Sequence, residues 1–245
     1  MSDQRVSVLG VDFLHTTMNE MVARLAKHLE QEDKTFVVTA NPEIVLYAEE
    51  DEDYRGYLKK ATYITADGIG VVKAAAMLGT PLPERVTGFD MFMELLALAN
   101  ERQYSIYLLG AKDEVLQKTI AEIERQFPQV NIAGSHHGYF DWEDPSIENE
   151  IQAAKPDMVF LALGFPRQEK WIAEKMDSFE KGLFMGIGGS FDVLAGEVKR
   201  APVFWQKIHL EWFYRLVKQP SRWRRMLALP IFAGKVWREK RKGTS

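Results

Sequence analysis

The amino-acid sequence predicts an α/β protein with a Rossmann-like, mostly parallel sheet, helices on both faces, and a helical C-terminal appendage rich in basic and aromatic residues. Short apolar runs alternate with amphipathic segments of helical length, which is typical of βαβ units. No internal repeat or low-complexity stretch interrupts this alternation, and the composition changes sharply near residue 199. We therefore expect a Rossmann-like core over residues 1–195 and an appendage over residues 196–245.

Apolar and β-branched runs predict the strands. Arg5–Phe13 fits a strand or a short hairpin, and Met158–Leu163 is the most apolar run of the chain. The other expected strands are Thr35–Thr39, Ala61–Ile64, Tyr104–Leu109, Val130–Ala133 and Leu183–Ile187. About six of these runs belong to the sheet, because helical segments separate them along the chain.

Apolar residues at helical spacing predict the helices between the strands. In Thr17–Gln31, for example, Met18, Met21, Leu25 and Leu29 recur every three or four residues. A further helix is expected to begin near Glu169. The other expected helices are Glu43–Glu50, Val71–Leu78, Phe89–Arg102, Glu114–Phe127 and Ile147–Ala154.

The overall composition excludes several classes of protein. Of the 245 residues, 46% are hydrophobic and 27% are charged, which suits a folded chain with a sizeable core. There is no cysteine, so disulfides, thiolate metal sites and cysteine nucleophiles are excluded. The first residues lack the pattern of a secretory signal, and no run of about 18 apolar residues predicts a transmembrane helix.

The net charge of −4 conceals a strong asymmetry along the chain. From Lys199 onward there are 13 Lys and Arg residues against two acids, Glu211 and Glu239, whereas the first 198 residues carry 18 bases and 33 acids. The same basic segment holds four of the six tryptophans, which are Trp205, Trp212, Trp223 and Trp237.

Aromatic rings interleaved with Lys and Arg favour the interface of an anionic membrane. Two alternatives remain open for this segment. It can be a helical cap whose aromatic side chains pack on the core, or it can bind single-stranded nucleic acid by ring stacking.

Polar or glycine-rich residues follow four of the expected strands, and the carboxyl ends of parallel strands lie along one edge of a sheet, where ligands bind. These clusters are Thr39 with Asn41, Asp67, Gly164–Gln168 and Gly186–Asp192. Their coincidence favours a shared pocket. Asn41 also precedes Pro42 and is expected to cap the following helix approximately.

Asp67 lies between an expected strand end and a helix start, and Gly68 and Gly70 follow it. Glycines at such a turn permit a close approach of ligand to the backbone. The alternative is an ordinary aspartate that caps the following helix. Two interpretations of Arg85 also remain open. It can be a solvated surface residue, or it can bind a phosphate through paired hydrogen bonds.

The absence of several well-known motifs argues against redox, nucleotide-hydrolysing and metal enzymes. The chain has no GxGxxG after its first strand, no GxxxxGK[ST] loop and no GxSxG elbow. Gly186–Gly189 can still bring backbone amides to a phosphate. His136 and His137 are adjacent, so on a strand we expect them to point to opposite faces rather than to share a metal. We therefore expect no metal and no cofactor.

Five motifs in one order resemble the WecG/TagA/CpsF glycosyltransferase family, most closely its TagA branch of wall teichoic acid synthesis. The resemblance extends to Arg200–Pro202 and the Trp/Arg-rich tail. The motifs are Thr39–Glu43, Ala66–Gly68, Arg85–Gly88, Gly164–Glu169 and Gly186–Asp192.

The resemblance implies an inverting, metal-independent enzyme. It would transfer N-acetylmannosamine from UDP-N-acetylmannosamine to the 4-hydroxyl of undecaprenyl-diphosphate-linked N-acetylglucosamine, forming the β-1,4 linkage-unit disaccharide of wall teichoic acid. Asp67 would be the general base. The residues implied in substrate binding are Thr39, Asn41, Arg85, Gln168, Gly188, Gly189, Arg215, Arg222 and Arg225.

On this interpretation the protein is cytoplasmic and peripherally attached to the inner face of the cell membrane, with the anionic membrane surface as a partner and no nucleic acid. The sequence does not predict whether the protein forms a homo-oligomer. The alternatives are a related transferase that uses UDP-N-acetylmannosamine uronic acid or another UDP-hexose for a surface polysaccharide, and a non-catalytic protein that binds anionic lipid or nucleic acid.

Overall fold

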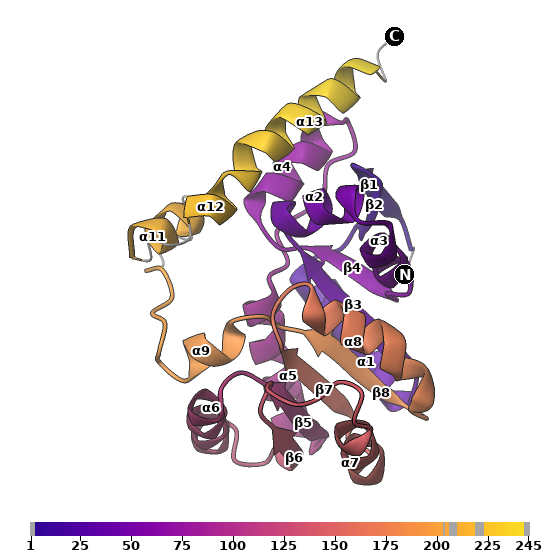
Figure 1. Cartoon of the computed structure of the whole chain (residues 1–245), viewed down its shortest axis with the longest axis vertical. Helices are drawn as coiled ribbons and strands as arrows, with labels where there is room; N and C mark the ends of the chain where they lie inside the picture. The colour runs from indigo at the N-terminus through magenta and orange to yellow at the C-terminus, as the bar shows by residue number, and fades with distance from the viewer. Residues whose placement is uncertain (1–2, 203, 206–209, 219–222, 243–245) are drawn as a thin grey trace.

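The computed structural model describes residues 3–202, 204–205, 210–218 and 223–242. A parallel sheet of six strands forms the centre, in the order β4-β3-β8-β7-β5-β6 (Figure 1). The strands are β3 (Lys34–Ala40), β4 (Tyr63–Ala66), β5 (Ser105–Gly110), β6 (Asn131–His136), β7 (Met158–Ala162) and β8 (Gly182–Gly186). The predicted Rossmann-like sheet is confirmed.

Helices cover both faces of the sheet because each strand alternates its side chains between two apolar cores. In β7, Val159 and Leu161 face one core, whereas Met158 and Phe160 face the other. The first core includes α2 (Pro42–Glu50), α3 (Glu52–Lys59), α4 (Ile69–Met77), α7 (Ser146–Ala154) and α8 (Arg167–Lys175). The second includes α1 (Met18–Glu30), α5 (Gly88–Arg102), α6 (Asp113–Gln126) and α9 (Ser190–Leu194).

The expected strands of the sheet and the helices with predicted bounds are all present, with ends that differ by at most three residues. The N-terminal run is the hairpin rather than a single strand: β1 (Arg5–Val8) pairs antiparallel with β2 (Val11–Leu14). Leu9 and Gly10 make the turn with φ of 50° and 80°, the backbone that two-residue hairpin loops require.

Helix α3 was not predicted, and its central Gly56 lowers the helix propensity of the segment. The structure shows why the segment is helical. The Asp51 carboxylate accepts a hydrogen bond from the Tyr54 N–H at 2.8 Å, which is an N-terminal cap, and the side chains of Tyr54 and Leu58 are buried.

The C-terminal appendage is helical, as predicted, and packs on the core. Its helices are α11 (Glu211–Lys218), α12 (Trp223–Met226) and α13 (Ala228–Lys242). Helix α13 lies against α2 and α4 (Figure 1), where it buries Phe232 and Val236. Lys235 also pairs with Glu49 at 3.0 Å. For α13, the alternative of a helical cap whose side chains pack on the core is therefore correct. Within the described residues, no helix is both long and apolar enough to span a bilayer.

Gly110 ends β5 in a backbone geometry that only glycine tolerates. Its φ is +128°, and an added Cβ would lie 2.5 Å from the carbonyl carbon of Ala162 on β7. We expect Gly110→Ala to lower the free energy of unfolding by roughly 2–4 kcal/mol, through backbone strain and overpacking. Gly56→Ala is the matched control, because a Cβ at Gly56 meets nothing within 4 Å; in a helix it should gain roughly 0.5–1 kcal/mol. Urea unfolding of both variants measures this difference, and equal stabilities would contradict it.

Candidate active site

The polar strand ends meet at the carboxyl edge of the sheet, where the strand order reverses. From β3 the chain continues to β4 on one side, whereas β8 lies on the other side of β3. In open α/β sheets a ligand crevice forms outside the strands at such a reversal. The loops after β3, β4 and β8 therefore define the candidate site.

Asp67 follows β4 and is held by two backbone contacts. Its N–H donates to the carbonyl of Ala40 at the end of β3, at 2.9 Å. Its carboxylate oxygen Oδ2 accepts a hydrogen bond from the N–H of Gly88 at 3.3 Å, and Gly88 is the first residue of α5. The positive end of a 15-residue helix favours a carboxylate at this point.

Asp67 does not cap the helix that follows it. The N-cap of α4 is Gly68, with φ of 128° and no side-chain hydrogen bond to the helix. The capping alternative is therefore wrong for α4. The carboxylate instead contacts the start of a different helix, α5, which begins 21 residues later in the chain.

Thr39 and Asp67 are brought together around Gly88. A Cβ on Gly88 would lie 2.8 Å from the Thr39 hydroxyl oxygen and 3.7 Å from Oδ2 of Asp67. A side chain at position 88 would collide with the Thr39 hydroxyl, so the start of α5 can lie this close to Thr39 because the residue is glycine. The geometry shows that these two strand ends lie together, and their use in a shared substrate site stays a prediction.

Asn41 lies beside this pair and caps α2, as predicted. Its side-chain oxygen accepts a hydrogen bond from the Ile44 N–H at 3.0 Å. The adjoining Pro42 packs against the turn after Asp67, because a Cβ on Gly70 would lie 2.9 Å from Pro42 Cγ. The capping bond fixes the Asn41 side chain, and its role toward substrate stays a prediction.

Arg85 is anchored to the appendage. Its Nη1 lies 3.2 Å from the Glu211 carboxylate, and the two side chains are only 18% and 11% exposed. Glu211 was not singled out from the sequence, because nothing in the chain pattern pairs it with a residue 126 positions away. The solvated alternative for Arg85 is excluded by this burial, and its role as a phosphate ligand stays a prediction.

A second ion pair ties the appendage to the start of α5. Both terminal nitrogens of the Arg200 guanidinium contact the Asp90 carboxylate, at 2.7 and 2.8 Å, and the group lies over the Phe89 ring. Burial alone would raise the pKa of Asp90, but hydrogen bonds from Arg200 and Thr87 outweigh it and hold that pKa below its usual value.

The tail arginines of the predicted site lie beyond what the structure describes. Arg222 is outside the described residues, and so are the side chains of Arg215 and Arg225, whose backbones belong to α11 and α12. Their contacts with a diphosphate stay predictions.

Gln168 and the glycines after β8 contact one another directly. The Gln168 side chain is buried, and its Oε1 accepts a hydrogen bond from the Gly188 N–H at 3.0 Å. Its Nε2 donates to Oε1 of Glu169 at 2.8 Å. Gly188 has a φ of +53°, and Gly189 is exposed. Substrate contacts by Gln168, Gly188 and Gly189 stay predictions.

Glu169 is a residue that the sequence did not single out. It is 2% exposed, and burial raises its pKa to about 7. Burial and the charge of Glu169 in turn raise the pKa of Tyr54. A Gln-Glu pair at the start of a helix is usually exposed, so no sequence signal marked this carboxyl group as buried.

The His136 and His137 rings lie on the same side, contrary to the prediction. Their ring centroids are 4.4 Å apart, because β6 ends at His136 and His137 lies beyond it. Nδ1 of His136 contacts the carbonyl of His137 at 2.8 Å. In the part of the chain that the structure describes, no three His, Cys, Asp or Glu side chains form a group able to hold a metal ion.

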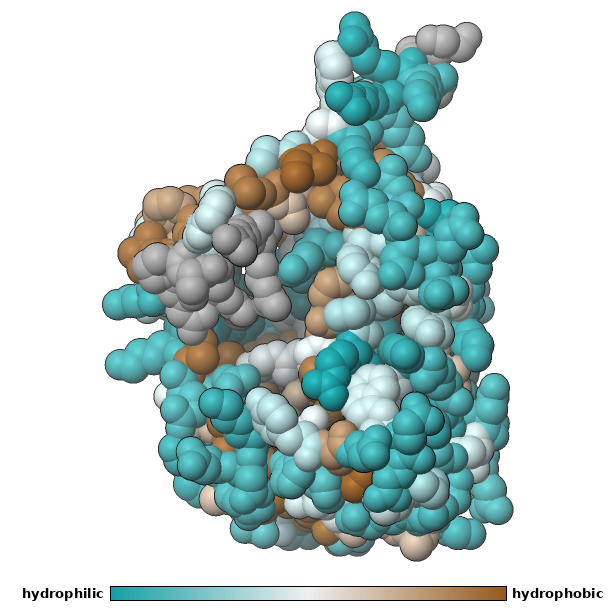
Figure 2. Space-filling view, viewed as in Figure 1, coloured by the Kyte–Doolittle hydropathy of each residue, from teal (hydrophilic) through white to brown (hydrophobic). Residues whose placement is uncertain are grey.

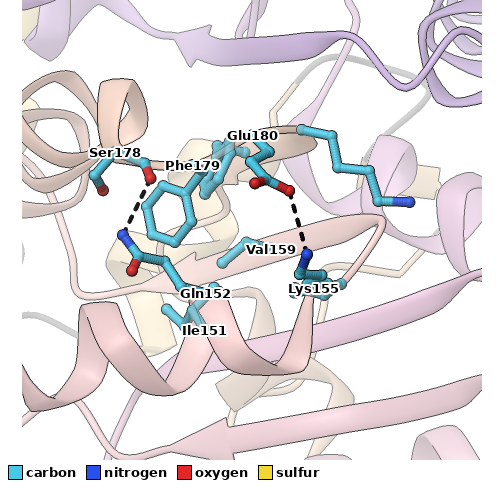
Figure 3. Close-up of a pocket in the computed structure, with 10 residues that line it drawn as sticks. Ile151, Gln152, Lys155, Val159, Ser178, Phe179 and Glu180 are labelled. Atoms are coloured by element: carbon cyan, nitrogen blue, oxygen red, sulfur yellow. Dashed lines mark hydrogen bonds and ion pairs between the residues drawn. The ribbon is translucent and has the colours of Figure 1, made fainter.

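A pocket of about 150 Å³ lies at the opposite, amino-terminal edge of the sheet (Figure 3). Phe179 and Val159 contribute apolar side chains, and Lys155 pairs with Glu180 at its rim. No predicted site residue lines it. We therefore place the candidate site at the carboxyl edge, where the polar strand ends converge, rather than in this pocket.

The fold and the site define an α/β enzyme-like protein with an oriented carboxylate at the ligand-binding edge of a parallel sheet. The chain belongs to the WecG/TagA/CpsF glycosyltransferase family, since the model of that family matches residues 6–245. It is also 40% identical over 240 residues to the N-acetylglucosaminyldiphosphoundecaprenol N-acetyl-beta-D-mannosaminyltransferases of Staphylococcus aureus strains MW2 and COL, covering 97% of this chain and 94% of each relative. The family resemblance inferred from the motifs is confirmed.

The raised pKa of Glu169 predicts a pH-dependent contribution to stability. Its folded pKa of about 7 exceeds the unfolded value near 4.5, so stability is lost as the pH rises through the folded pKa. Glu169→Gln stays neutral and removes this loss. We expect the melting temperature of Glu169→Gln relative to wild type to increase by a few degrees between pH 5.5 and 8.5. A pH-independent difference, measured by calorimetry, would contradict the raised pKa.

Proposed function

We propose that this protein transfers N-acetylmannosamine from UDP-N-acetylmannosamine to the 4-hydroxyl of N-acetylglucosamine on undecaprenyl diphosphate. The product carries the β-1,4 linkage-unit disaccharide of wall teichoic acid. Family membership and the names of the Staphylococcus aureus relatives support this activity. The structural observation that carries it is the Asp67 carboxylate, oriented by the first N–H of α5 beside Thr39.

Asp67 acts as the general base. As the acceptor oxygen attacks the anomeric carbon, a new C1–O bond forms and the bond from C1 to the UDP oxygen breaks on the opposite face, which inverts the configuration. The acceptor hydroxyl is a poor nucleophile, so Asp67 takes its proton as the bond forms. The Gly88 N–H donates to the carboxylate and fixes its orientation.

The departing UDP carries the negative charge that develops at the leaving oxygen. Cationic side chains and backbone amides stabilise such charge in the transition state. Arg85 supplies a guanidinium beside the start of α5, and Arg215, Arg222 and Arg225 are its proposed partners from the appendage. Thr39, Asn41, Gln168, Gly188 and Gly189 bind the sugar and the nucleotide.

The appendage, residues 196–245, places the enzyme on the anionic membrane that holds its lipid acceptor. Figure 2 shows hydrophobic side chains gathered over the appendage helices. The large apolar side chains exposed there are Phe204, Trp212, Phe213, Val217, Trp223, Leu227, Ile231 and Trp237. Exposed apolar patches of this kind mark interaction sites, and the basic residues between them suit lipid phosphates.

The role of Asp67 is tested by Asp67→Asn. The amide cannot accept the proton, so we expect kcat with lipid-linked acceptor to fall about 10²–10⁴-fold with an unchanged melting temperature. Asp12→Asn, which changes an exposed aspartate on β2, is the control and should keep wild-type turnover. An Asp67→Asn protein with wild-type turnover would exclude Asp67 as the base and favour a non-catalytic binding protein.

The membrane role is tested by placing charge in the exposed apolar surface. Trp212→Glu with Trp223→Glu should reduce co-sedimentation with vesicles containing anionic lipid at least tenfold, because both rings are exposed and lose apolar contact with the bilayer. Tyr139→Glu, an exposed ring after β6 at the far side of the sheet, is the control. Equal vesicle binding by the double variant would contradict the proposed surface, and a gel shift with single-stranded oligonucleotide tests the nucleic-acid alternative.

A further inference from the structure

A chain of buried polar groups connects α8 to the loop after β8. It begins at the Glu169 carboxyl, which is 2% exposed, and passes to Gln168, which is 5% exposed. The Gln168 amide donates to Glu169 at 2.8 Å and accepts from the Gly188 N–H at 3.0 Å. Gln168 therefore links a buried carboxyl group on one element to the backbone of another.

Two neighbours of the Gln168 amide determine which way it faces. If the amide were flipped, its NH₂ group would meet the Gly188 N–H, and its carbonyl oxygen would meet the Glu169 carboxyl oxygen. The contact with Gly188 would be repulsive in a buried place, where an unpaired polar group costs roughly 1–3 kcal/mol, and the contact with Glu169 would be repulsive when that carboxyl group is ionised. The Gly188 N–H and the ionised Glu169 carboxylate thus favour the same orientation of the Gln168 amide.

The Gln168 amide lies close to the backbone at the end of β8. A Cβ on Gly186 would lie 2.5 Å from Gln168 Nε2, so the amide packs directly against the end of β8. Gly188 itself has a φ of +53°, and a Cβ there would meet nothing within 4 Å. The peptide that joins Ile187 and Gly188 is held on both sides. Its carbonyl accepts hydrogen bonds from the Ser190 hydroxyl at 2.6 Å and the Ser190 N–H at 3.2 Å, and its N–H donates to Gln168, which is the contact that ties it to α8.

Glu169 also has an unusual environment for a carboxyl group. Its Oε2 and the hydroxyl of Tyr54 are both buried and lie close enough to interact with each other, although neither has a well-aligned hydrogen bond among the described residues. The Tyr54 ring packs edge-to-face on Tyr47 and Phe165. A buried carboxyl group in aromatic surroundings costs stability, so its presence calls for a role that an apolar side chain cannot fill.

We propose that Glu169 is a positioning residue for the UDP-sugar donor: it orients the Gln168 amide, which in turn holds the Gly188 peptide and fixes the loop after β8 at the site. This inference rests on the proposed function, since it assigns the donor to that loop. Glu169 is too buried to touch the donor, so it acts through Gln168.

The first test measures the loop and the donor site separately. In the full-length protein, Glu169→Leu should accelerate amide hydrogen exchange at residues 186–190 at least tenfold. It should also raise the Kd for UDP and the KM for the donor about tenfold, with kcat changed less than threefold. Glu169→Gln keeps an acceptor for Gln168. Its hydrogen-exchange rates, its Kd for UDP and its KM for the donor should therefore stay within about threefold of the wild-type values. Glu174→Gln, an exposed site on the same helix, is the control.

A double-mutant cycle keeps the inference falsifiable if Glu169→Leu fails to fold. Gln168→Glu alone sets two acidic groups together and should weaken UDP binding at least tenfold. When Gln168→Glu is combined with Glu169→Gln, the two side chains are exchanged. The carboxylate now at position 168 accepts from both the Gly188 N–H and the amide now at position 169, so most of the UDP affinity should return.

Two outcomes would overturn the proposal. One is unchanged exchange at residues 186–190 in both Glu169→Leu and Gln168→Glu. The other is a double variant as weak as Gln168→Glu, which would make the Gln168 amide a direct ligand. If the wild type binds no UDP, the proposed function fails, whereas the hydrogen-exchange result still decides whether Glu169 holds the loop.

Discussion

The close approach of α5 to the ends of β3 and β4 is the constraint on which the candidate site depends. After β4 the chain leaves the sheet, forms α4 and returns, and the N–H of Val86 then donates to the Ala66 carbonyl at 3.0 Å. This contact brings Gly88 against Thr39 and Asp67. A side chain at position 88 would collide with the Thr39 hydroxyl, so this glycine lets the start of α5 come close enough for its first N–H to bind the Asp67 carboxylate.

The same helix terminus is where the appendage docks. Asp90 in the first turn of α5 binds Arg200, and Arg85 just before the helix binds Glu211. The other acid of the segment from Lys199 onward, Glu239, accepts a hydrogen bond from the Leu9 N–H at 3.3 Å. Both acids of this basic segment are therefore used in contacts with the core, a distribution that suits an appendage whose outer surface meets anionic lipid.

The sequence predicted the alternating strands and helices because their apolar periodicity is local. It also predicted the convergence of Thr39 and Asp67, since parallel strands bring their carboxyl ends to one edge. It could not predict that Glu211 pairs with Arg85 or that Glu169 is buried, because both depend on packing between distant segments. The error at His136 and His137 has a local cause: the strand ends at His136, so the alternation of side chains between two faces does not extend to His137.

The two carboxyl groups of the site, Asp67 and Glu169, differ in environment, and the difference separates their roles. A pKa of about 7 would by itself nominate Glu169 as the general base. A base must, however, lie within hydrogen-bond distance of the proton that it takes, and a carboxyl group that is 2% exposed cannot meet a lipid-linked sugar. Asp67 is partly exposed at the sheet edge and accepts a hydrogen bond from the start of α5, so its accessibility supports the proposal that it, and not Glu169, is the base. On the proposed roles, the pKa of Glu169 is raised because the carboxyl group is buried beside Gln168, where it can orient that amide but cannot reach a substrate.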